Sequence, residues 1–425
     1  MSIQSWLGVL VPHSSTEDAP DVSNGEIIAI DSDSTVALPF QPIQADVSTE
    51  SSTSDAVYLA ENSTAEALGH PLEIQSSTLP DLPVAQQDLI VPENEADSIR
   101  ELILRVQGVY QLQGDESSAR LRVIGSYVFN PNLLVGGTAE VSYGDAFTSS
   151  DDVEFALNEL YLTISPEEIP NVRLTVGLMD LTSYFDRNSF AKDDTIHFFN
   201  SVFETNPALS AAGIDSRPGV LLNWSVIDNL EVRAAAFSSS RDLDEFAIDA
   251  FAGEVAMRFG NAIVRGTYVT DRDAGYRTGF NEIFQFDRGD GFGLDADDRE
   301  QAYGINAEFF IPELNLGLFG RYGWYENLEL DRSANTFNFG INVLNLFMLD
   351  DRLGLGYGRE LSNDNLREDR GDETPDVMEL FYDFRITPNV RVGTTAQLRD
   401  EFSESVFGFR IRADFDVTEL GRLFR

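Results

Sequence analysis

The sequence contains no cysteine and only three histidines, His13, His70 and His197, and these shortages exclude several chemistries. Without cysteine there can be no disulfides, thiolate zinc sites, iron-sulfur clusters or cysteine nucleophiles. The histidines are too far apart in the sequence to predict a multi-histidine metal site, so we expect neither a metal nor a cofactor. No apolar run reaches the roughly 18 residues of a membrane helix, which excludes a helical membrane protein but leaves a membrane barrel open.

Basic residues are also scarce, since 29 Lys and Arg stand against 72 Asp and Glu and give a formal net charge of -43. A polyanion of this kind repels phosphate backbones, so no nucleic-acid partner is expected. Lys192 is the one lysine among those 29 basic residues. Arginine holds planar, bidentate geometry and therefore suits a fixed charged wall better than lysine does.

Residues 1–99 hold 17 acidic residues, no Lys or Arg and three aromatic residues. Such a segment cannot bury enough apolar surface to offset the entropy lost on ordering, so we expect it to be largely disordered. Its short apolar run, Trp6 to Val11, lacks the preceding positive charges of a secretory signal peptide, which is therefore not evident. We interpret the segment as a solvated spacer, with a small anchoring or partner-binding module as the alternative, and residues 100–425 as a separate domain.

From Arg100 to Phe415 apolar and polar residues alternate with period two, as in strands that have one apolar and one polar face. In the first segment Leu102, Leu104 and Val106 share one face, and Arg105 and Gln107 share the other. We count sixteen such segments. Short turns are predicted at 130–132, 165–171, 228–229, 260–261, 312–313, 345–351 and 387–389. Polar connections, most of them longer, are predicted near 113–118, 144–154, 180–217, 238–250, 270–300, 325–335, 360–376 and 400–405.

Alternation of short and long connections is typical of up-and-down barrels in outer membranes, and an even strand count lets the last strand close on the first. The sequence therefore predicts an all-β fold, a 16-stranded antiparallel transmembrane β-barrel preceded by a largely disordered acidic segment. A soluble β-sandwich or two stacked domains is the alternative. Interfacial aromatic girdles are expected at strand ends, as at Phe129, Tyr143, Trp224 and Phe415.

Alternation places thirteen arginines and eight acids on the water side of the strands. The predicted pore-lining arginines are Arg105, Arg120, Arg122, Arg173, Arg233, Arg258, Arg265, Arg321, Arg385, Arg391, Arg399, Arg410 and Arg412. The acids are Glu140, Glu159, Glu231, Glu254, Glu308, Glu379, Asp383 and Asp414. A charged wall facing an acidic loop would set up a transverse field across a water-filled pore. The alternative is that the arginines pair with neighbouring acids and only satisfy a polar interior.

The longest predicted connection, 180–217, is too rich in phenylalanine to lie in solvent, so we expect it to fold into the barrel and narrow it. A cap on the outside of the barrel is the alternative. The predicted constriction residues are Asp180, Tyr184, Asp186, Arg187, Lys192, Asp193, Asp194 and His197. Of these, Asp180, Tyr184, Asp186, Asp193 and Asp194 are expected to face the arginine wall. Four aromatic residues turned inward, Tyr161, Phe237, Phe319 and Phe381, either fill the lumen or offer stacking faces to sugars.

Three stretches resemble the carbohydrate-selective porins of bacterial outer membranes, in the form found in cyanobacteria. They are VRLTVGLMDLTSYFDRNSFAKDDTIHFFNSVFETNPAL (172–209), SRPGVLLNW (216–224) and YDFRITPNVRVGTTAQL (382–398). The resemblance implies a trimeric barrel in outer-membrane lipid that passes sugars and other small hydrophilic solutes. Relatives in cyanobacteria are also described as porins for inorganic ions, including iron. Residues 1–99 show no S-layer-homology module, which such relatives usually carry, and the usual terminal aromatic residue is replaced by a penultimate Phe424.

Two other classes compete with a porin: an enzyme and a closed structural tether. An enzyme is not expected, because the sequence has no GxSxG, GxxxxGK[ST] or HExxH motif. His197 in the phenylalanine-rich loop is more readily a packed residue than a general base.

The acidic stretch from Asp287 to Glu300 does not have EF-hand spacing, so we interpret it as a solvated loop that at most bridges divalent cations loosely.

Overall fold

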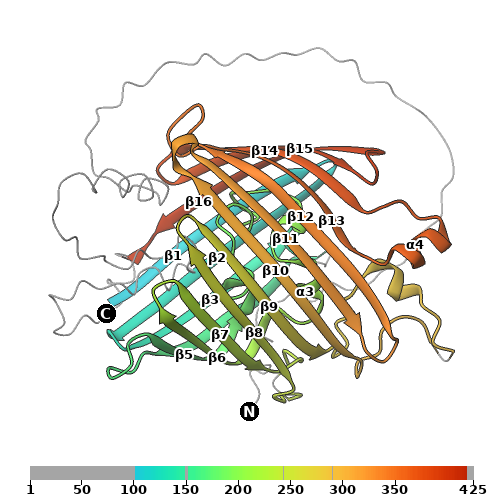
Figure 1. Ribbon diagram of the computed structural model, residues 1–425. Helices are drawn as coiled ribbons and strands as arrows, with labels where there is room; N and C mark the ends of the chain where they lie inside the picture. The colour runs from blue at the N-terminus through green and yellow to red at the C-terminus, as the bar shows by residue number, and fades with distance from the viewer. Residues whose placement is uncertain (1–100, 149–151, 243, 290, 419–425) are drawn as a thin grey trace, which may run out of the picture. The chain divides into compact units, whose positions relative to one another are not determined.

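The computed structural model describes residues 101–148, 152–242, 244–289 and 291–418. The predicted disordered segment, 1–99, lies outside the described residues. Sixteen antiparallel strands close into one barrel, in which each strand pairs with its neighbours in sequence and β1 pairs with β16 (Figure 1). This closure confirms the predicted fold class. It also leaves no unpaired sheet edge within the described part of the chain, which is the condition for a sheet to stand in hydrocarbon.

The strands run as follows: β1 Glu101–Gln113, β2 Glu116–Asn130, β3 Leu133–Tyr143, β4 Glu154–Ile164, β5 Val172–Asp180, β6 Ser216–Ile227, β7 Leu230–Phe237, β8 Ala250–Phe259, β9 Ala262–Arg272, β10 Arg299–Ile311, β11 Leu316–Asn327, β12 Arg332–Leu344, β13 Arg352–Ser362, β14 Asp376–Thr387, β15 Val390–Arg399 and β16 Glu404–Asp416. Short helical turns occupy the connections: η4 Leu181–Ser183, η5 Ser201–Phe203, α3 Pro207–Ala211, η6 Asn281–Gln285, η7 Pro312–Leu314 and α4 Asp364–Arg370.

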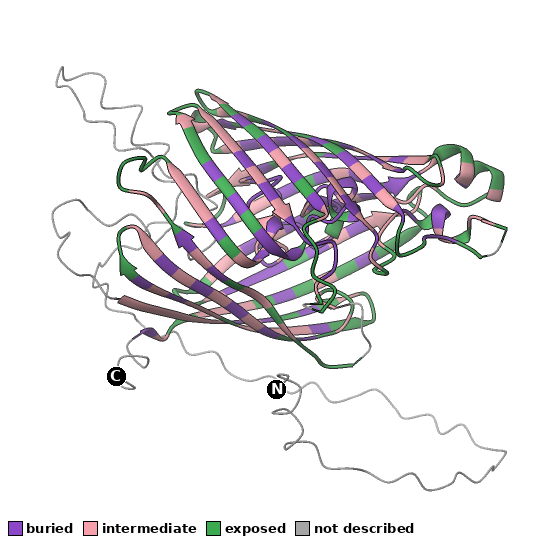
Figure 2. Cartoon of the chain, turned by 90° about the horizontal axis from the view of Figure 1, so that it is seen from below, coloured by how far each residue is buried: buried purple, intermediate pink, exposed green. Residues whose placement is uncertain are grey.

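Alternation in the sequence becomes alternation of burial along each strand (Figure 2). In β11 the side chains of Phe319 and Arg321 are buried inside the barrel, whereas Tyr322 is 49% exposed on the outside. Leu121, Ile305 and Phe407 are likewise exposed on the outer surface. An outer face this rich in exposed apolar side chains is typical of a lipid-facing barrel and atypical of a soluble protein.

All seven predicted short turns are found at one end of the barrel, between β2 and β3 and then between every second pair of strands up to β14 and β15. At the other end, five of the eight polar connections are long. Two residues join β1 to β2, and four each join β11 to β12 and β15 to β16, because strand pairing continues into the polar stretches on both sides of these turns. The predicted long connections at 113–118, 325–335 and 400–405 are therefore wrong in length.

Candidate functional site

The connection between β5 and β6, residues 181–215, is hereafter the inner loop. Its phenylalanines Phe185, Phe198, Phe199 and Phe203 are each no more than 5% exposed. Short helical turns start where a side chain accepts the backbone N–H two residues ahead, as Asp180 does for Thr182. Because these buried rings touch side chains of the inner wall, the inner loop lies inside the barrel rather than over its mouth.

A cluster of aromatic rings joins the inner loop to the wall. The ring centroid of Phe198 lies 4.3 Å from that of Phe203, 4.6 Å from Phe381 on β14 and 5.5 Å from Phe319 on β11. Glycine on the wall makes the room: a Cβ at Gly356 would sit 2.7 Å from the Phe203 ring and 2.8 Å from that of Phe198. The inner loop therefore packs as a core against the β10–β14 side of the wall.

Polar side chains of the wall hold the backbone of the inner loop. The Glu379 carboxylate accepts the N–H groups of Phe199 and Asn200 at 2.7 and 2.9 Å. Asn338 Nδ2 donates to the carbonyl of Val202 at 2.6 Å. Further contacts of this kind are donated by Asn342 to Phe190 O and by Asn306 to Arg187 O, and Glu308 accepts the N–H of Ser189. A loop inside a barrel cannot use strand pairing, so these side chains satisfy its backbone instead.

The functional positions of Asn306, Asn338 and Asn342 were not predicted from the sequence, although all three occupy inward positions of the alternation. An amide on an inner face is the signal that could have found them. Arg352 was also missed: its Nη1 lies 2.5 Å from His197 Nε2.

Three predicted arginines form ion pairs with acids of the inner loop. Arg321 Nε lies 3.0 Å from Asp186, Arg412 Nη1 lies 3.1 Å from Asp193, and Arg120 Nη1 lies 3.3 Å from Asp194. Arg410 donates to the carbonyl of His197 at 3.1 Å. Since Arg120 stands on β2 and Arg321 on β11, the inner loop spans the lumen from one wall to the other.

Six of the predicted arginines pair with acids of the wall or of a short turn. Arg122 pairs with Glu140 at 2.7 Å, Arg233 with Glu254 at 2.6 Å and with Glu231, Arg265 with Glu308 at 2.9 Å, Arg385 with Asp350 at 2.7 Å, Arg391 with Asp383 at 2.6 Å, and Arg410 with Asp383 at 3.3 Å. Both interpretations of the arginines thus have a structural basis. Some pair within the wall, and others face the inner loop.

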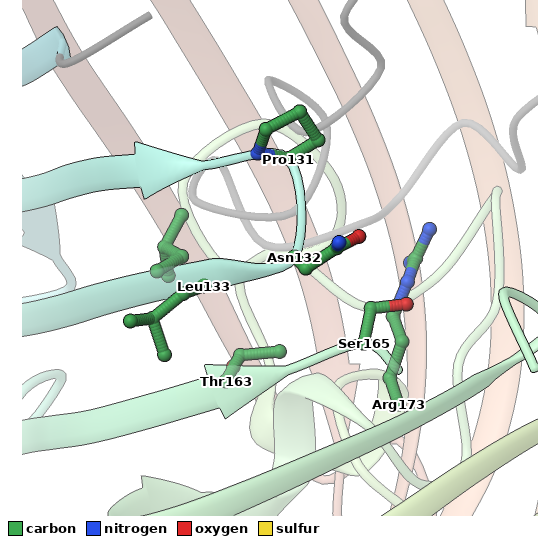
Figure 3. Close-up of a pocket in the computed structure, with 7 residues that line it drawn as sticks. Pro131, Asn132, Leu133, Thr163, Ser165 and Arg173 are labelled. Carbon is green, nitrogen blue, oxygen red and sulfur yellow. The ribbon is translucent and has the colours of Figure 1, made fainter. Parts of the chain in front are cut away.

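The remaining four predicted arginines lie near strand ends. Arg399 donates to Gln397 at 2.8 Å, and Arg105 stands on the inner face at the start of β1. Arg173 and Arg258 lie close to short turns, and within the described ranges neither forms an ion pair with a carboxylate. Arg173 borders a small pocket with Asn132, Ser165 and Thr163 (Figure 3). It therefore does not face the acids of the inner loop, contrary to our expectation.

The other predicted constriction residues lie in the inner loop or, in the case of Asp180, at the end of β5. The Asp180 carboxylate caps η4, and the carbonyl of Tyr184 accepts from Arg233 at 2.9 Å. Arg187 is buried, and its carbonyl accepts from Asn306 at 3.0 Å. Lys192 Nζ donates to Thr205 Oγ1 at 2.7 Å. Asp193 retains 39% exposure of its side chain, so it lies at the solvent boundary of the inner loop.

His197 is held as a structural residue. It is 2% exposed, and its Nδ1 accepts the backbone N–H groups of Lys192 and Asp193 at 3.3 and 3.2 Å. Burial, together with the neighbouring Arg352 guanidinium, keeps the pKa of His197 well below its ordinary value. With both ring nitrogens engaged and the ring out of reach of solvent, His197 is not placed to act as a general base.

The four rings proposed for sugar stacking are buried: Tyr161 is 3% exposed, Phe237 0%, Phe319 5% and Phe381 0%. Phe319 and Phe381 belong to the aromatic cluster beneath the inner loop, and the Tyr161 ring lies against Gly136. None of the four offers a free face to a solute, because each fills the space between the wall and its neighbours. Of the two roles predicted for these rings, their burial therefore favours filling the interior over stacking on sugars.

The acidic stretch near β10 is only partly solvated, contrary to the sequence interpretation. Asp298 and Glu300 are 2% and 0% exposed, and the register of β9 with β10 sets Glu300 directly opposite Asp271, itself 1% exposed. One oxygen each of Asp271 and Glu300 has no hydrogen-bond partner. Like charges facing each other across a strand pair are unfavourable.

Within the described ranges, no three His, Cys, Asp or Glu side chains are grouped so that they could hold a metal ion. None of the described helices has the length and apolar character needed to cross a membrane.

The barrel is similar to those of solved outer-membrane structures. Pseudomonas putida OprB, solved at high pH, is 13% identical over 75% of this chain and 94% of its own, with a TM-score of 0.55. Salmonella typhi OmpF, in complex with daunomycin, is 12% identical over 75% of this chain and 98% of its own, with a TM-score of 0.50. A loop-deletion variant of OmpT, an outer membrane protein of Vibrio cholerae, is 15% identical over 75% of this chain and 99% of its own, also at 0.50. At these identities the likeness shows a shared barrel fold.

No protein-family model matches the sequence. An uncharacterized protein of Aquifex aeolicus (strain VF5) is 23% identical over 240 residues, which are 56% of this chain and 63% of that protein. The matched region thus spans less than two thirds of that relative.

Proposed function

We propose that this protein is an outer-membrane porin through which small hydrophilic solutes diffuse passively. The observation that carries the proposal is the inner loop, which is clamped inside a closed barrel by ion pairs to both β2 and β11. A loop held in this way narrows the lumen of a barrel of this size, and this role requires no catalytic group of the kind that an enzyme would need. The apolar outer surface and the fold shared with OprB, OmpF and OmpT support an outer-membrane location.

For the solute we favour uncharged carbohydrates. Most of the predicted inner-wall arginines are neutralised by carboxylates, so the wall presents a dense set of hydrogen-bond donors and acceptors with little free charge. Such a surface can replace the hydration of sugar hydroxyls without a strong electrostatic barrier. The resemblance to carbohydrate-selective porins of the cyanobacterial type supports the same choice. A homotrimer, as that resemblance implies, is part of the proposal.

Inorganic ions, including iron, are the second candidate class, and one observation favours them. The side chains of Asp193 and Asp194 at the constriction retain 39% and 19% exposure. Carboxylates at the solvent boundary of a narrow passage attract cations. These acids are paired with arginines, however, which weakens the net field and ranks ions below sugars.

Liposome swelling with a graded series of sugars, run beside planar-bilayer conductance on the full chain, tests the proposal. We expect ohmic conductance steps and swelling rates that fall as the sugar grows. A barrel that closes the membrane as a structural tether would give neither conductance nor swelling, and that result would refute the porin. Ohmic steps without swelling by any sugar would select the ion alternative.

A further inference from the structure

The short turn between β12 and β13, residues 345–351, carries four consecutive apolar residues at its tip. Leu346 is 43% exposed, Phe347 72%, Met348 44% and Leu349 78%. The turn is hereafter called the apolar turn. The other short turn of the same length, 165–171, carries the exposed acids Glu167 and Glu168 instead. Exposed apolar residues in a row generally mark a surface that contacts a partner or a membrane.

The apolar turn is a built structure that presents these residues in a fixed arrangement. The Asp351 carboxylate accepts the backbone N–H groups of Leu346, Phe347 and Met348 at 2.6, 2.9 and 3.0 Å. Asn345 and Asp350 adopt left-handed backbone angles, with φ of 54° and 63°. Three of the backbone N–H groups at the tip are therefore satisfied within the turn, which lowers the cost of placing it in an apolar environment.

The tip points away from the lumen. The Phe347 ring lies 5.7 Å from that of Tyr382, which in turn stacks on Phe384 at 5.4 Å. Tyr382 alternates along β14 with the buried, inward Phe381 and Asp383, so it stands on the outer face of the barrel. The Tyr382 hydroxyl donates to Asp351 at 2.8 Å and ties the turn to that face.

The opposite side of the turn is charged and faces inward. The Asp350 carboxylate lies 2.7 Å from both Arg385 and Arg391 at the end of the wall. The apolar turn is therefore amphipathic, with its acid paired toward the pore and its apolar tip continuous with the lipid-facing aromatic residues of β14. A surface that extends the lipid-facing band best fits lipid as its occupant.

We propose that the apolar turn inserts into the lipid boundary of the membrane leaflet at the short-turn end of the barrel, which in outer-membrane barrels is the periplasmic leaflet. Leu349 and Phe347 enter the acyl-chain boundary, while Tyr382 and Phe384 form the aromatic girdle beside them. The turn thereby fixes the depth of the barrel on this side. This inference rests on the proposed location in an outer membrane.

A depth measurement tests the proposal, and the absence of cysteine makes it direct. Leu349→Cys and the matched control Glu168→Cys are each labelled with an environment-sensitive fluorophore on the full chain in phosphatidylcholine liposomes. We expect the probe at 349 to emit at blue-shifted wavelengths and to be quenched by lipids spin-labelled near the headgroup. The probe at 168 should emit as in water and be quenched by aqueous iodide.

Iodide quenching at position 349 equal to that at 168 would overturn the proposal. So would a blue-shifted probe at 349 that spin-labelled lipids do not quench, because that combination identifies a protein partner or a second copy as the occupant. Conductance is recorded on the same liposomes. Ohmic conductance steps together with a water-exposed probe at position 349 would refute lipid insertion but not the porin function. If the probe at position 349 is quenched by lipid but no conductance steps are seen, the porin function alone is refuted.

Discussion

Replacing Asp193 and Asp194 by asparagine is expected to shift the preference of the channel from cations toward anions. These acids stand at the solvent boundary of the inner loop, at 3.1 Å from Arg412 and 3.3 Å from Arg120. The double variant removes two negative charges and leaves both arginines without a carboxylate on the inner loop. Asparagine keeps a side-chain acceptor for the N–H of Thr195, so the local turn should persist.

The size of the shift follows from Coulomb's law. An ion passing about 6 Å from one carboxylate in water gains or loses about 0.7 kcal/mol, and screening at 0.1 M salt lowers this to about 0.4 kcal/mol. Each of the two charges changes the barrier for a cation and the barrier for an anion by about 0.4 kcal/mol in opposite directions. The difference between the two barriers therefore changes by about 1.6 kcal/mol, which corresponds to a roughly 10-fold change in the cation-to-anion permeability ratio. The reversal potential in a potassium chloride gradient across a planar bilayer measures this ratio.

Two control variants make the measurement decisive. Arg120→Gln with Arg412→Gln should move the ratio in the opposite direction by a similar factor. Asp297→Asn with Asp331→Asn removes the same charge from exposed connections outside the lumen and should change the ratio little. If the aspartate and arginine variants shift the ratio in the same direction, or if neither changes it more than the control does, the constriction does not control charge selection.

Three further results are expected. Phe198→Ala removes the central ring of the aromatic cluster, so the packing of the inner loop on the wall should weaken by about 3–5 kcal/mol and single-channel conductance should rise. The control Phe407→Ala, on the outer face, should not raise the conductance. An unchanged conductance in Phe198→Ala would refute the role of the aromatic cluster in holding the inner loop. Glu300→Gln should stabilise the barrel toward thermal unfolding by roughly 1 kcal/mol, because it replaces a buried acid that faces the buried Asp271 with a neutral amide, and a loss of stability would contradict this. Burial lowers the pKa of Lys192 to about 8, so raising the pH from 7 to 9 removes a positive charge and should increase cation preference, a step that should be absent in Lys192→Met.

The alternation of apolar and polar residues was sufficient to predict the barrel, because the face of a strand on which a side chain lies depends only on its position in a period of two. Tyr322 and Arg321, adjacent in the sequence, accordingly point outward and inward. Strand length was less predictable. At residues 113–118, strand pairing continues through consecutive polar residues as far as the pair Gln113 and Glu116, which shortens the connection to two residues.

Contacts that depend on the register of distant strands could not be predicted from the sequence. Arg410 of β16 reaches Asp383 of β14, two strands away, and the pair forms only once the barrel curves. The buried opposition of Asp271 and Glu300 likewise depends on the register of β9 with β10. Conversely, the high phenylalanine content of 180–217 was enough to predict an inward loop, because apolar content is a property of the segment alone.

The way the inner loop is anchored determines where solutes can be selected. Its backbone is held on the β10–β14 side by Glu379 and Asn338, and its rings pack against the wall there. The loop carboxylates that keep solvent contact beside wall arginines are Asp193 and Asp194, on the side of β16 and β2. Arginines far from this passage, paired within the wall, can shape its rigidity but exert little field on a solute. Under the proposed function, selection by charge is therefore expected at a few ion pairs of the inner loop with the wall, and the paired arginines of the wall are expected to provide the hydrogen-bonding surface for uncharged solutes.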